Sequence, residues 1–421
     1  MISLLVIACL LLAEPEAAEV AVLVRALDSP QLQERDAAER KLDAMGPAVL
    51  KQLPTSDEDL SAEAAGRIKR LRQKLLRAQA ISAAEPTQVT LTAKDEPLDK
   101  LLAEIARQSG NGIKDHREAF GQVIESRKLS VEFDKKPFWA ALDEVLDQAQ
   151  LTIYGYSGEE GLAVVNRPTG AAPRAARANY SGAFRLEPKR LEAVRDLAGA
   201  EQGGLRLILE IAWEPRLKPF ALLMPLADLT AKTDLGLAAL SNPEAEPETI
   251  VRSGATAAEL DMLFNLPPRE AKSFALVAGQ ITAIVPGPLE EFRFTELPIV
   301  AGGKRPRAVP QTQGGTTVTL DSLRPNADLW EVNLRIKFEA PSAALESHRG
   351  WMLNNEALML DAQGKEIGSF GIEQTLQAEE IGLKYLFELP DGAEGMTFVY
   401  RTPLVVLELP VKYEFKNLPL P

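Results

Sequence analysis

Apolar residues follow a helical spacing near the N-terminus and a strand spacing through most of the later sequence. Residues 19–80 are rich in Ala, Glu, Arg and Lys, which favour helices, and Gly46-Pro47 predicts a break between two of them. The apolar residues of the last predicted helix are spaced i, i+3, i+7 and i+8, on one face: Ile68, Leu71, Leu75 and Leu76. We therefore expect a helical unit over residues 19–80.

The sequence from Leu27 to Gly46 follows the pattern L-x-S-P-x-x-x-x-R-D-A-A-x-x-x-L-x-x-x-G. This pattern resembles one unit of the HEAT type of helical repeat. Stable solenoids need three or more such units, so we expect this single unit to pack on a neighbouring part of the chain.

Six basic residues are concentrated on the last predicted helix: Arg67, Lys69, Arg70, Arg72, Lys74 and Arg77. Such a cluster can form a face for nucleic acid or an anionic membrane, or it can be the solvated side of an amphipathic helix. The whole chain is acidic, with 47 Lys and Arg against 60 Asp and Glu. Because an acidic protein has no general attraction for polyanions, we interpret the cluster as a solvated face and expect no nucleic-acid partner.

Residues 86–167 alternate between strand and helix patterns. Val89, Leu91 and Ala93 lie on one face of a predicted strand, and Pro97 then introduces a helix. The same order returns later with the following strand face and proline: Leu129, Val131, Phe133 and Pro137. The expected apolar helix stripes are Leu98, Leu101, Leu102 and Ile105, then Phe138, Ala141, Leu142, Val145 and Leu146. A predicted hairpin with its turn at 157–161 completes a compact two-helix α+β domain.

Two stretches of this segment carry specific patterns: D-x-P-L-x-x-L-L-x-x-I-A-x-Q-S-G-N, which ends at Asn111, and P-F-x-x-A-L-D-x-V-L, which ends at Leu146. With the following L-T-I-Y…G-L-A-V-V, they resemble the short N-terminal domain shared by secretins and TonB-dependent receptors (the STN domain). The resemblance implies an envelope location and a protein-binding role, and no catalytic residues. The insertion GIKDHREAFGQVIESR at 112–127 departs from the family, because it is longer than the family's usual connection.

After a linker at 168–180, rich in Ala, Pro and Arg, the chain becomes β-rich and repeats itself. Three blocks recur in the same order: 205–215 with 329–341, 263–267 with 386–390, and 292–298 with 413–419. This recurrence indicates two tandem β-sandwich domains, at 181–300 and 316–421, joined by a Gly- and Pro-rich linker at 301–315. Three residue pairs should occupy corresponding strands: Ile211 with Ile336, Phe264 with Phe387, and Phe294 with Phe415. Leu297-Pro298 and Leu418-Pro419 should each end the last strand of a sandwich.

The first twelve residues, MISLLVIACLLL, form an apolar run as long as a signal-peptide core and too short to span a bilayer. Small residues follow, so cleavage near Ala17 or Ala18 would remove 1–18 as a signal peptide. A short buried helix is the alternative, because no Lys or Arg precedes the run. A second alternative is a lipobox at Val6-Ile7-Ala8-Cys9, which would make Cys9 a lipidated anchor, although the apolar run continues past it. We expect a periplasmic or extracellular protein.

Few residues suggest catalysis or metal binding. His116 lies in KDHREAF beside Asp115 and Glu118, and His348 lies in ESHRGW, but neither has further ligands at metal-site spacing. The chain has a single Cys, and no nucleophile elbow, phosphate-binding glycine loop or His-Glu-x-x-His motif. We therefore expect no catalytic residue, no metal and no cofactor.

Paired carboxylates are the signature of a glycosidase, and two neighbouring pairs are candidates: Glu290 with Glu291 and Glu379 with Glu380. Neighbours on a strand point to opposite faces, so neither pair would converge on one sugar. Glu214 and Glu339 recur before a proline, and we interpret them as solvent-facing strand ends.

Aromatic side chains could form a sugar platform, and the candidates are Trp213, Trp330 and Trp351. Two of the three lie in predicted strands, where burial in the core is the commoner outcome. The segment Asp361-Ala362-Gln363-Gly364-Lys365 lacks the alternating oxygens of a calcium loop, and we interpret it as a hairpin turn.

Together these patterns predict a multidomain α+β and all-β protein: a short helical unit, a small two-helix α+β domain and two tandem β-sandwiches. With 46% hydrophobic and 25% charged residues, the composition fits globular domains and excludes bulk disorder. We expect a non-enzymatic exported scaffold that binds other envelope proteins through the STN-like domain or sandwich edge strands, with membrane association only if Cys9 is lipidated. The alternative is a carbohydrate-binding or glycoside-hydrolysing protein acting through the sandwiches.

Overall fold

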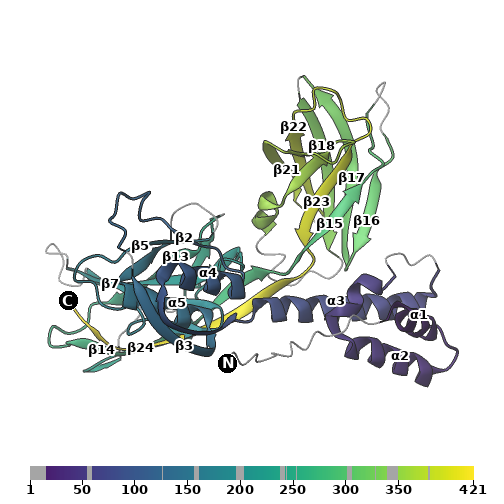
Figure 1. Cartoon of the computed structure of the whole chain (residues 1–421). Helices are drawn as coiled ribbons and strands as arrows, with labels where there is room; N and C mark the ends of the chain where they lie inside the picture. The colour runs from purple at the N-terminus through teal and green to yellow at the C-terminus, as the bar shows by residue number, and fades with distance from the viewer. Residues whose placement is uncertain are drawn as a thin grey trace. The chain divides into compact units, whose positions relative to one another are not determined.

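The computed structural model describes residues 16–54, 59–125, 127–155, 161–195, 203–237, 242, 244–252, 254–300, 306–327, 329–338, 349–377 and 380–421. The fold is mixed α+β (Figure 1). The chain divides into two compact units: unit 1 contains Met1–Ala83, Gly287–Ala343 and Met352–Val405, and unit 2 contains Ala84–Pro286, Ala344–Trp351 and Val406–Pro421. Among the described residues, no helix has the length and apolar character needed to cross a membrane. The apolar run with Cys9 lies outside the described residues.

The described chain opens with helices, as predicted: α1 (Ala17–Ala26), α2 (Leu32–Ala44), the 3-10 helix η1 (Gly46–Gln52) and α3 (Ala62–Ala84). Helix α2 ends at the predicted break, where Gly46 has a φ of 68° and Pro47 follows. The helices share a core that contains most of the predicted stripe: Val20, Leu23, Leu27, Leu42, Val49, Leu53, Ile68, Leu71 and Leu75.

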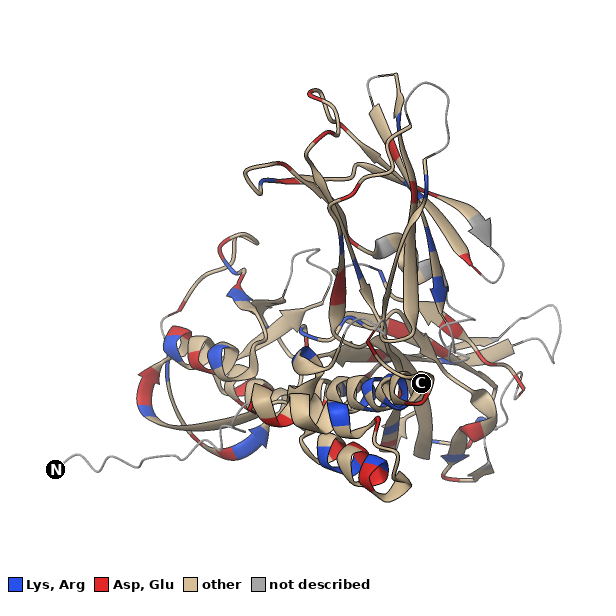
Figure 2. Ribbon diagram, turned by 90° about the vertical axis from the view of Figure 1, so that its right-hand side faces the viewer, with Lys and Arg blue, Asp and Glu red and all other residues tan. Residues whose placement is uncertain are grey.

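The interpretation of the basic cluster as a solvated face is wrong for Arg67. Its side chain is only 10% exposed, and its guanidinium forms ion pairs with Asp36 (2.9 Å), Glu39 and Glu63 (3.1 Å). Basic and acidic residues are intermixed along the helices (Figure 2). Arg67 thus joins α2 to α3, because two of its acidic partners come from α2.

The α+β domain begins unit 2 and consists of two strand–proline–helix elements. β1 (Gln88–Pro97) precedes α4 (Leu98–Ser109), β3 (Lys128–Pro137) precedes α5 (Phe138–Ala149), and the two strands pair antiparallel. Each helix begins one residue after its proline, and its first N–H donates to the carbonyl that precedes the opposite strand. These bonds join Leu98 to Arg127 (3.0 Å) and Phe138 to Thr87 (2.9 Å). The repeated sequence pattern therefore folds as a pseudo-symmetric pair.

The predicted core of this domain is confirmed except at Leu91 and Ala93, which are only partly buried against it. The helix stripes and strand faces form one buried cluster, which contains Val89, Leu98, Leu101, Leu102, Ile105, Leu129, Val131, Phe133, Phe138, Ala141, Leu142, Val145 and Leu146. A separate sheet has the order β2 (Ile113–Asp115), β5 (Leu162–Asn166), β4 (Leu151–Tyr154), with β2 parallel and β4 antiparallel to β5. The hairpin of β4 and β5 is thus present, while most of its predicted turn lies outside the described residues.

Two larger sheets complete unit 2. The first has the order β13 (Ala257–Asn265), β8 (Gly203–Trp213), β7 (Phe184–Arg195), β6 (Asn179–Ser181). The second has the order β11 (Gly236–Leu237), β10 (Thr230–Thr233), β14 (Ser273–Pro286), β9 (Ala221–Leu223), β12 (Glu248–Ile250), and β24 (Val406–Pro419) also pairs with β14. The 3-10 helix η2 (Leu226–Asp228) connects β9 to β10.

Two further sheets belong to unit 1. The first has the order β16 (Val309–Gln313), β17 (Thr316–Asn326), β18 (Leu329–Phe338), β22 (Ile381–Phe387), β21 (Gly371–Gln377). The second has the order β15 (Leu289–Phe294), β23 (Thr397–Pro403), β19 (Ala357–Leu360), β20 (Glu366–Gly368). The 3-10 helix η3 (Arg349–Asn354) precedes β19.

The sheet pairs of the two units repeat one topology, as the duplicated sequence predicted. The order β13-β8-β7-β6 returns as β22-β18-β17-β16, and the order β12-β9-β14-β24 returns as β20-β19-β23-β15. The three predicted residue pairs lie in corresponding strands and are buried: Ile211 and Ile336, Phe264 and Phe387, Phe294 and Phe415.

The predicted domain boundaries, 181–300 and 316–421, are wrong because the two copies exchange their last strands. β15 follows β14 in sequence but pairs with β23 in unit 1, and β24 follows β23 but pairs with β14 in unit 2. A two-residue hairpin needs a positive φ in its turn, and none occurs between Pro286 and Leu289 or between Pro403 and Val406. Neither junction therefore contains the two-residue turn that would fold the next strand back onto the strand before it.

The Leu-Pro pairs mark only one of the two strand ends. Leu418-Pro419 ends β24, as predicted. β15 already ends at Phe294, so the prediction is wrong for Leu297-Pro298. The carbonyl oxygen of Pro298 instead accepts the N–H of Leu323 at 2.9 Å, which holds the segment after β15 against β17.

Candidate docking surfaces

The described histidine lies in a local ion-paired environment. The backbone N–H of His116 donates to Val164, and the adjacent Asp115 is bound by Arg117, with 2.6 Å between Nη2 and Oδ2. The hydrogen bonds from Arg117 lower the pKa of Asp115. In the described part of the chain, no three His, Cys, Asp or Glu side chains come together as a metal site, and His348 lies outside it.

The described acidic residues of the candidate carboxylate pairs lie in different environments. Glu291 accepts hydrogen bonds from Arg293 (2.6 Å) and Arg401 (3.1 Å); burial opposes ionisation, but these arginines lower its pKa overall. Burial raises the pKa of its neighbour Glu290. Glu380 forms an ion pair with Arg335, and its predicted partner Glu379 lies outside the described residues.

Glu214 is fully buried, so its interpretation as a solvent-facing strand end is wrong. Its carboxylate accepts four hydrogen bonds: from Thr87 N (2.9 Å) and Oγ1 (2.7 Å), Asn111 Nδ2 (3.0 Å) and Arg216 Nε (2.8 Å). Thr87 and Asn111 belong to the α+β domain, whereas Glu214 follows β8. The carboxylate therefore fastens this domain to the first large sheet. The equivalent Glu339 lies outside the described residues.

A second buried network fastens α5 to β6 and β7. Asp143 of α5 pairs with Arg185 at 2.9 Å and accepts the Tyr180 hydroxyl at 2.9 Å. The Arg185 guanidinium lies 4.3 Å from the ring centroid of Trp139, whose Nε1 donates to Ala183. This face of α5 is consequently not free to bind a partner.

The predicted linker at 168–180 is exposed over most of 168–177, but Arg174 is buried and holds it in place. Arg174 pairs with Glu187 at 3.0 Å. Asp147 of α5 accepts the backbone N–H groups of Arg174 (2.9 Å) and Ala175 (3.0 Å). The segment is thus fixed against both the α+β domain and β7.

The insertion in the α+β domain presents an apolar surface, which we call the insertion platform. It consists of three exposed side chains of the insertion, Phe120 (49% exposed), Val123 (74%) and Ile124 (51%), together with Tyr154 (41%) of β4. The rings of Phe120 and Tyr154 meet edge to face at 5.4 Å. Asn166 holds the insertion in place through Gln122 Oε1 (2.7 Å) and the carbonyl oxygen of Val123 (3.2 Å). The sequence marked the insertion as unusual, but its apolar residues follow no periodic pattern that predicts exposure.

A second surface is the outer edge of β13 at residues 259–265, which we call the open β13 edge. β13 pairs with β8 on one side, and no described strand pairs with it on the other. Trp213 N–H donates to Thr256 O at 3.2 Å, so Trp213 and Thr256 form a hydrogen-bonded pair. In an antiparallel ladder every second residue of β13 after Thr256 then bonds to β8, and the residues between them do not. By that alternation, the backbone N–H and C=O groups of Asp261, Leu263 and Asn265 point away from β8.

The equivalent edge in unit 1 is occupied. β22 corresponds to β13, and β21 pairs with it antiparallel on the side away from β18. Lys384 of β22 lies opposite Glu373 of β21 and forms an ion pair with it at 2.5 Å. Gly371 fits closely against Leu386, since a Cβ there would come within 3.2 Å of that side chain. The two copies thus differ at this edge.

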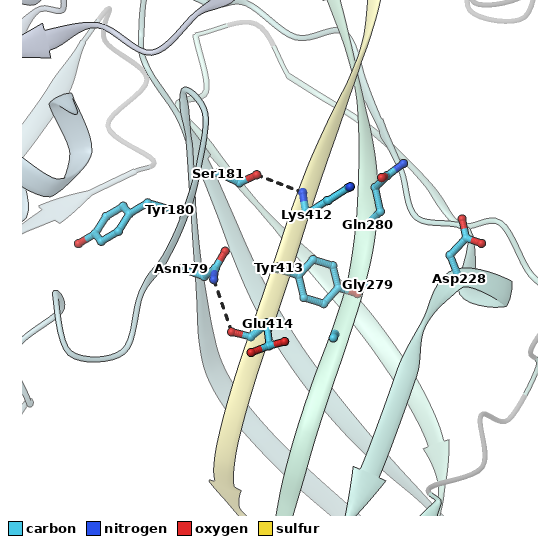
Figure 3. A pocket seen from close by; sticks show the side chains of 10 residues that line it. Asn179, Tyr180, Ser181, Asp228, Gly279, Gln280, Lys412, Tyr413 and Glu414 are labelled. Carbon is cyan, nitrogen blue, oxygen red and sulfur yellow. Dashed lines mark hydrogen bonds between the residues drawn. The ribbon is translucent and has the colours of Figure 1, made fainter. Parts of the chain in front are cut away.

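An open hollow lies where β6 approaches β24 (Figure 3), and it bears on the carbohydrate alternative. Its polar groups partly hold the strands together, since Ser181 Oγ accepts the N–H of Lys412 at 3.1 Å. Tyr413 is buried across Gly279 and offers no exposed ring. Trp213 is buried and Trp351 stacks on Phe220 at 4.8 Å, so neither forms a sugar platform.

The predicted turn at Asp361 is confirmed. Its carboxylate accepts the backbone N–H groups of Gln363 and Lys365, each at 2.9 Å, between the paired strands β19 and β20. The carboxylate is thus part of a hairpin turn.

Comparison with known proteins finds no matching protein-family model and no similar curated protein.

Proposed function

We propose that this protein is a non-enzymatic scaffold of the cell envelope that binds other envelope proteins. The observation that carries the proposal is the open β13 edge, with which no strand of the described chain pairs, while its counterpart in unit 1 is covered by β21. Unpaired backbone donors and acceptors along a strand can bind an extended segment of another chain. The two buried networks support this role, because they fix the α+β domain to the sheet that carries the edge.

The insertion platform supplies a second docking surface in this proposal. The α+β domain resembles the STN domain in its sequence patterns, and that resemblance implies contacts with envelope proteins. Three exposed apolar side chains of the insertion, with Tyr154 of β4 beside Phe120, are a suitable contact area for a protein partner. The HEAT-like helices complete the scaffold.

Export is part of the proposal and rests on the apolar N-terminal run. Cleavage near Ala18 would leave the buried residues of α1 intact, since the first of them is Val20. N-terminal sequencing of the protein from its native cell tests this step. We expect a start close to Ala18; an intact Met1 on cytoplasmic protein would contradict export, and a lipid on Cys9 would indicate anchoring.

Site-specific photo-crosslinking in the native cell tests partner binding at the edge. A photoreactive residue at Asn265 should give one discrete adduct with an envelope protein, and the same residue at Leu235, which is 58% exposed, should not. Leu263→Pro should abolish the adduct, because it removes an outward N–H that β8 does not use. Identical adducts from both positions, or none from Asn265, would refute the proposed function.

A further inference from the structure

We propose that the open β13 edge binds an extended basic segment of a partner protein, which adds antiparallel to β13 as β21 adds to β22. This inference rests on the proposed function and names the chemistry of the partner. Its basis is the duplication within the chain, because β21 pairs with β22 in one copy, whereas no described strand pairs with the equivalent side of β13 in the other.

The side chains of β13 suit strand addition. Leu260, Met262 and Phe264 are buried, whereas the alternate positions Asp261 and Leu263 are exposed. In an added strand, successive side chains would therefore point in turn toward the core face of the sheet and toward solvent. At the other end of β13, Ala257 lies against Gly155 of the α+β domain, so the accessible part begins near Glu259.

The occupied copy indicates what each position of the partner should carry. Aligning Phe264 with Phe387 places Leu263 at the position of Leu386, which faces Gly371. A small residue is therefore expected opposite Leu263.

The same alignment places Asp261 at the position of Lys384, which pairs with Glu373. The charge at this position is reversed, so its partner should be basic. In the occupied copy a bulge between Gln374 and Leu376 places Leu376 opposite Gly382, the equivalent of Glu259. A partner strand without this bulge would place a second basic residue, two positions after the first, opposite Glu259, and its expected pattern is Gly-x-Lys-x-Lys.

Arg206 and the possibility of pairing with a second copy of β13 both bear on the charge expected of the partner. Arg206 already contacts Asp261 at 2.6 Å, but both side chains are more than 40% exposed, so the carboxylate remains accessible to a second cation. Pairing of β13 with a second copy of itself around Asp261 would put two aspartates opposite each other, which is unfavourable. A basic strand from another protein avoids this repulsion.

Peptide binding to the full chain tests the inference. The probe is the β21 sequence with two lysines, Gly-Ile-Lys-Gln-Lys-Leu-Gln, and the matched control is Gly-Ile-Glu-Gln-Glu-Leu-Gln, both with blocked ends and a fluorescent label. Fluorescence anisotropy should give a dissociation constant about tenfold lower for the lysine peptide. Asp261→Lys should reverse or abolish this preference, and Leu263→Pro should abolish binding while circular dichroism stays unchanged.

Equal binding of both peptides, or a lysine preference that survives Asp261→Lys, would overturn the basic-strand inference. No binding of either peptide would also overturn it. In each case a discrete crosslink at Asn265 would leave the proposed function standing, whereas the absence of that crosslink would refute both. A concentration-dependent dimer that Leu263→Pro abolishes would assign the edge to a second copy and would also overturn the inference.

Discussion

The backbone N–H of Gly287 donates to the carbonyl oxygen of Val405 at 2.8 Å. These residues lie where β14 continues into β15 and where β23 continues into β24. The β14–β24 pairing ends with Pro286 opposite Val406, and the β15–β23 pairing begins with Leu289 opposite Pro403. The Gly287–Val405 bond lies between them in the same register. Each copy of the duplicated fold is thus completed by the last strand of the other.

The strand exchange predicts that damage to β24 affects unit 2, although β24 directly follows a strand of unit 1. Phe415 is 5% exposed and lies opposite Val277. Phe415→Ala should lower the free energy of unfolding by about 3–5 kcal/mol, because it leaves a cavity. Hydrogen exchange should accelerate in β14 more than in β17 and β18.

The matched control for this prediction is Lys416→Ala on the exposed face of β24, which should change stability by less than about 0.5 kcal/mol. Faster exchange confined to unit 1 would contradict the observed pairing.

The core of the α+β domain predicts a large effect for residues that the sequence already identified. Leu142 is fully buried and Leu102 is 7% exposed, so substituting either with Ala should cost about 2–5 kcal/mol. Urea unfolding measures both changes. Lys100→Ala on the exposed side of α4 is the control, and values within a few tenths of a kcal/mol for both leucines would show that they are not core residues.

The Glu214 carboxylate should be the most sensitive polar group between the α+β domain and β8. Glu214→Ala would remove the buried acceptor that Thr87 and Asn111 share and the ion-pair partner of Arg216, and should cost about 3–5 kcal/mol. Thermal unfolding measured by calorimetry checks this value. Glu408→Ala, at an exposed position of β24, should have almost no effect; equal effects of the two substitutions would contradict the assigned role.

The ion pair of Asp115 with Arg117 predicts a pH-dependent contribution to stability. Hydrogen bonds from Arg117 hold the pKa of Asp115 below its usual value of 3.8. A carboxylate with a lowered folded-state pKa stabilises the fold at pH values above the unfolded-state pKa, and this stabilisation disappears as the pH falls through the folded-state pKa.

Asp115→Asn should therefore cost about 1 kcal/mol at pH 7, a modest value because the aspartate side chain is 37% exposed. Urea unfolding at several pH values should give the same difference from pH 7 to pH 5 and a shrinking difference below about pH 3.8. A stability difference between wild type and Asp115→Asn that grows as the pH falls would contradict a lowered pKa of Asp115.

The sequence predicted those features that depend on local periodicity. Spacings of 3.6 and 2 residues identify the helix stripes and the strand faces of the α+β domain. The match of Phe264 with Phe387 follows from the recurrence of the strand pattern in the sequence. Which strand pairs with which does not follow from these spacings. The alternation of β24 is equally compatible with pairing to β23 or to β14, so the exchange could not be predicted from it.

The candidate sites were less predictable for the same physical reason. Glu214 before a proline has the sequence of an exposed strand end, and only its contacts with the distant residues Thr87 and Asn111 bury it. Phe120 and Val123 follow no spacing, so their exposure depends on how Asn166 holds the insertion. The open β13 edge follows from the order of strands in the sheet, which the spacing of apolar residues does not specify.

Amide hydrogen exchange over β13, in the partner complex recovered from the native cell and in the free protein, tests the central claim most directly. If a partner strand pairs with β13, the outward N–H groups of Asp261, Leu263 and Asn265 should exchange at least about tenfold more slowly in the complex, because they become hydrogen-bonded. The amides of β18, in the unit whose edge is already occupied, should not change. Unchanged exchange at these three residues in a complex that protects another surface would contradict the account.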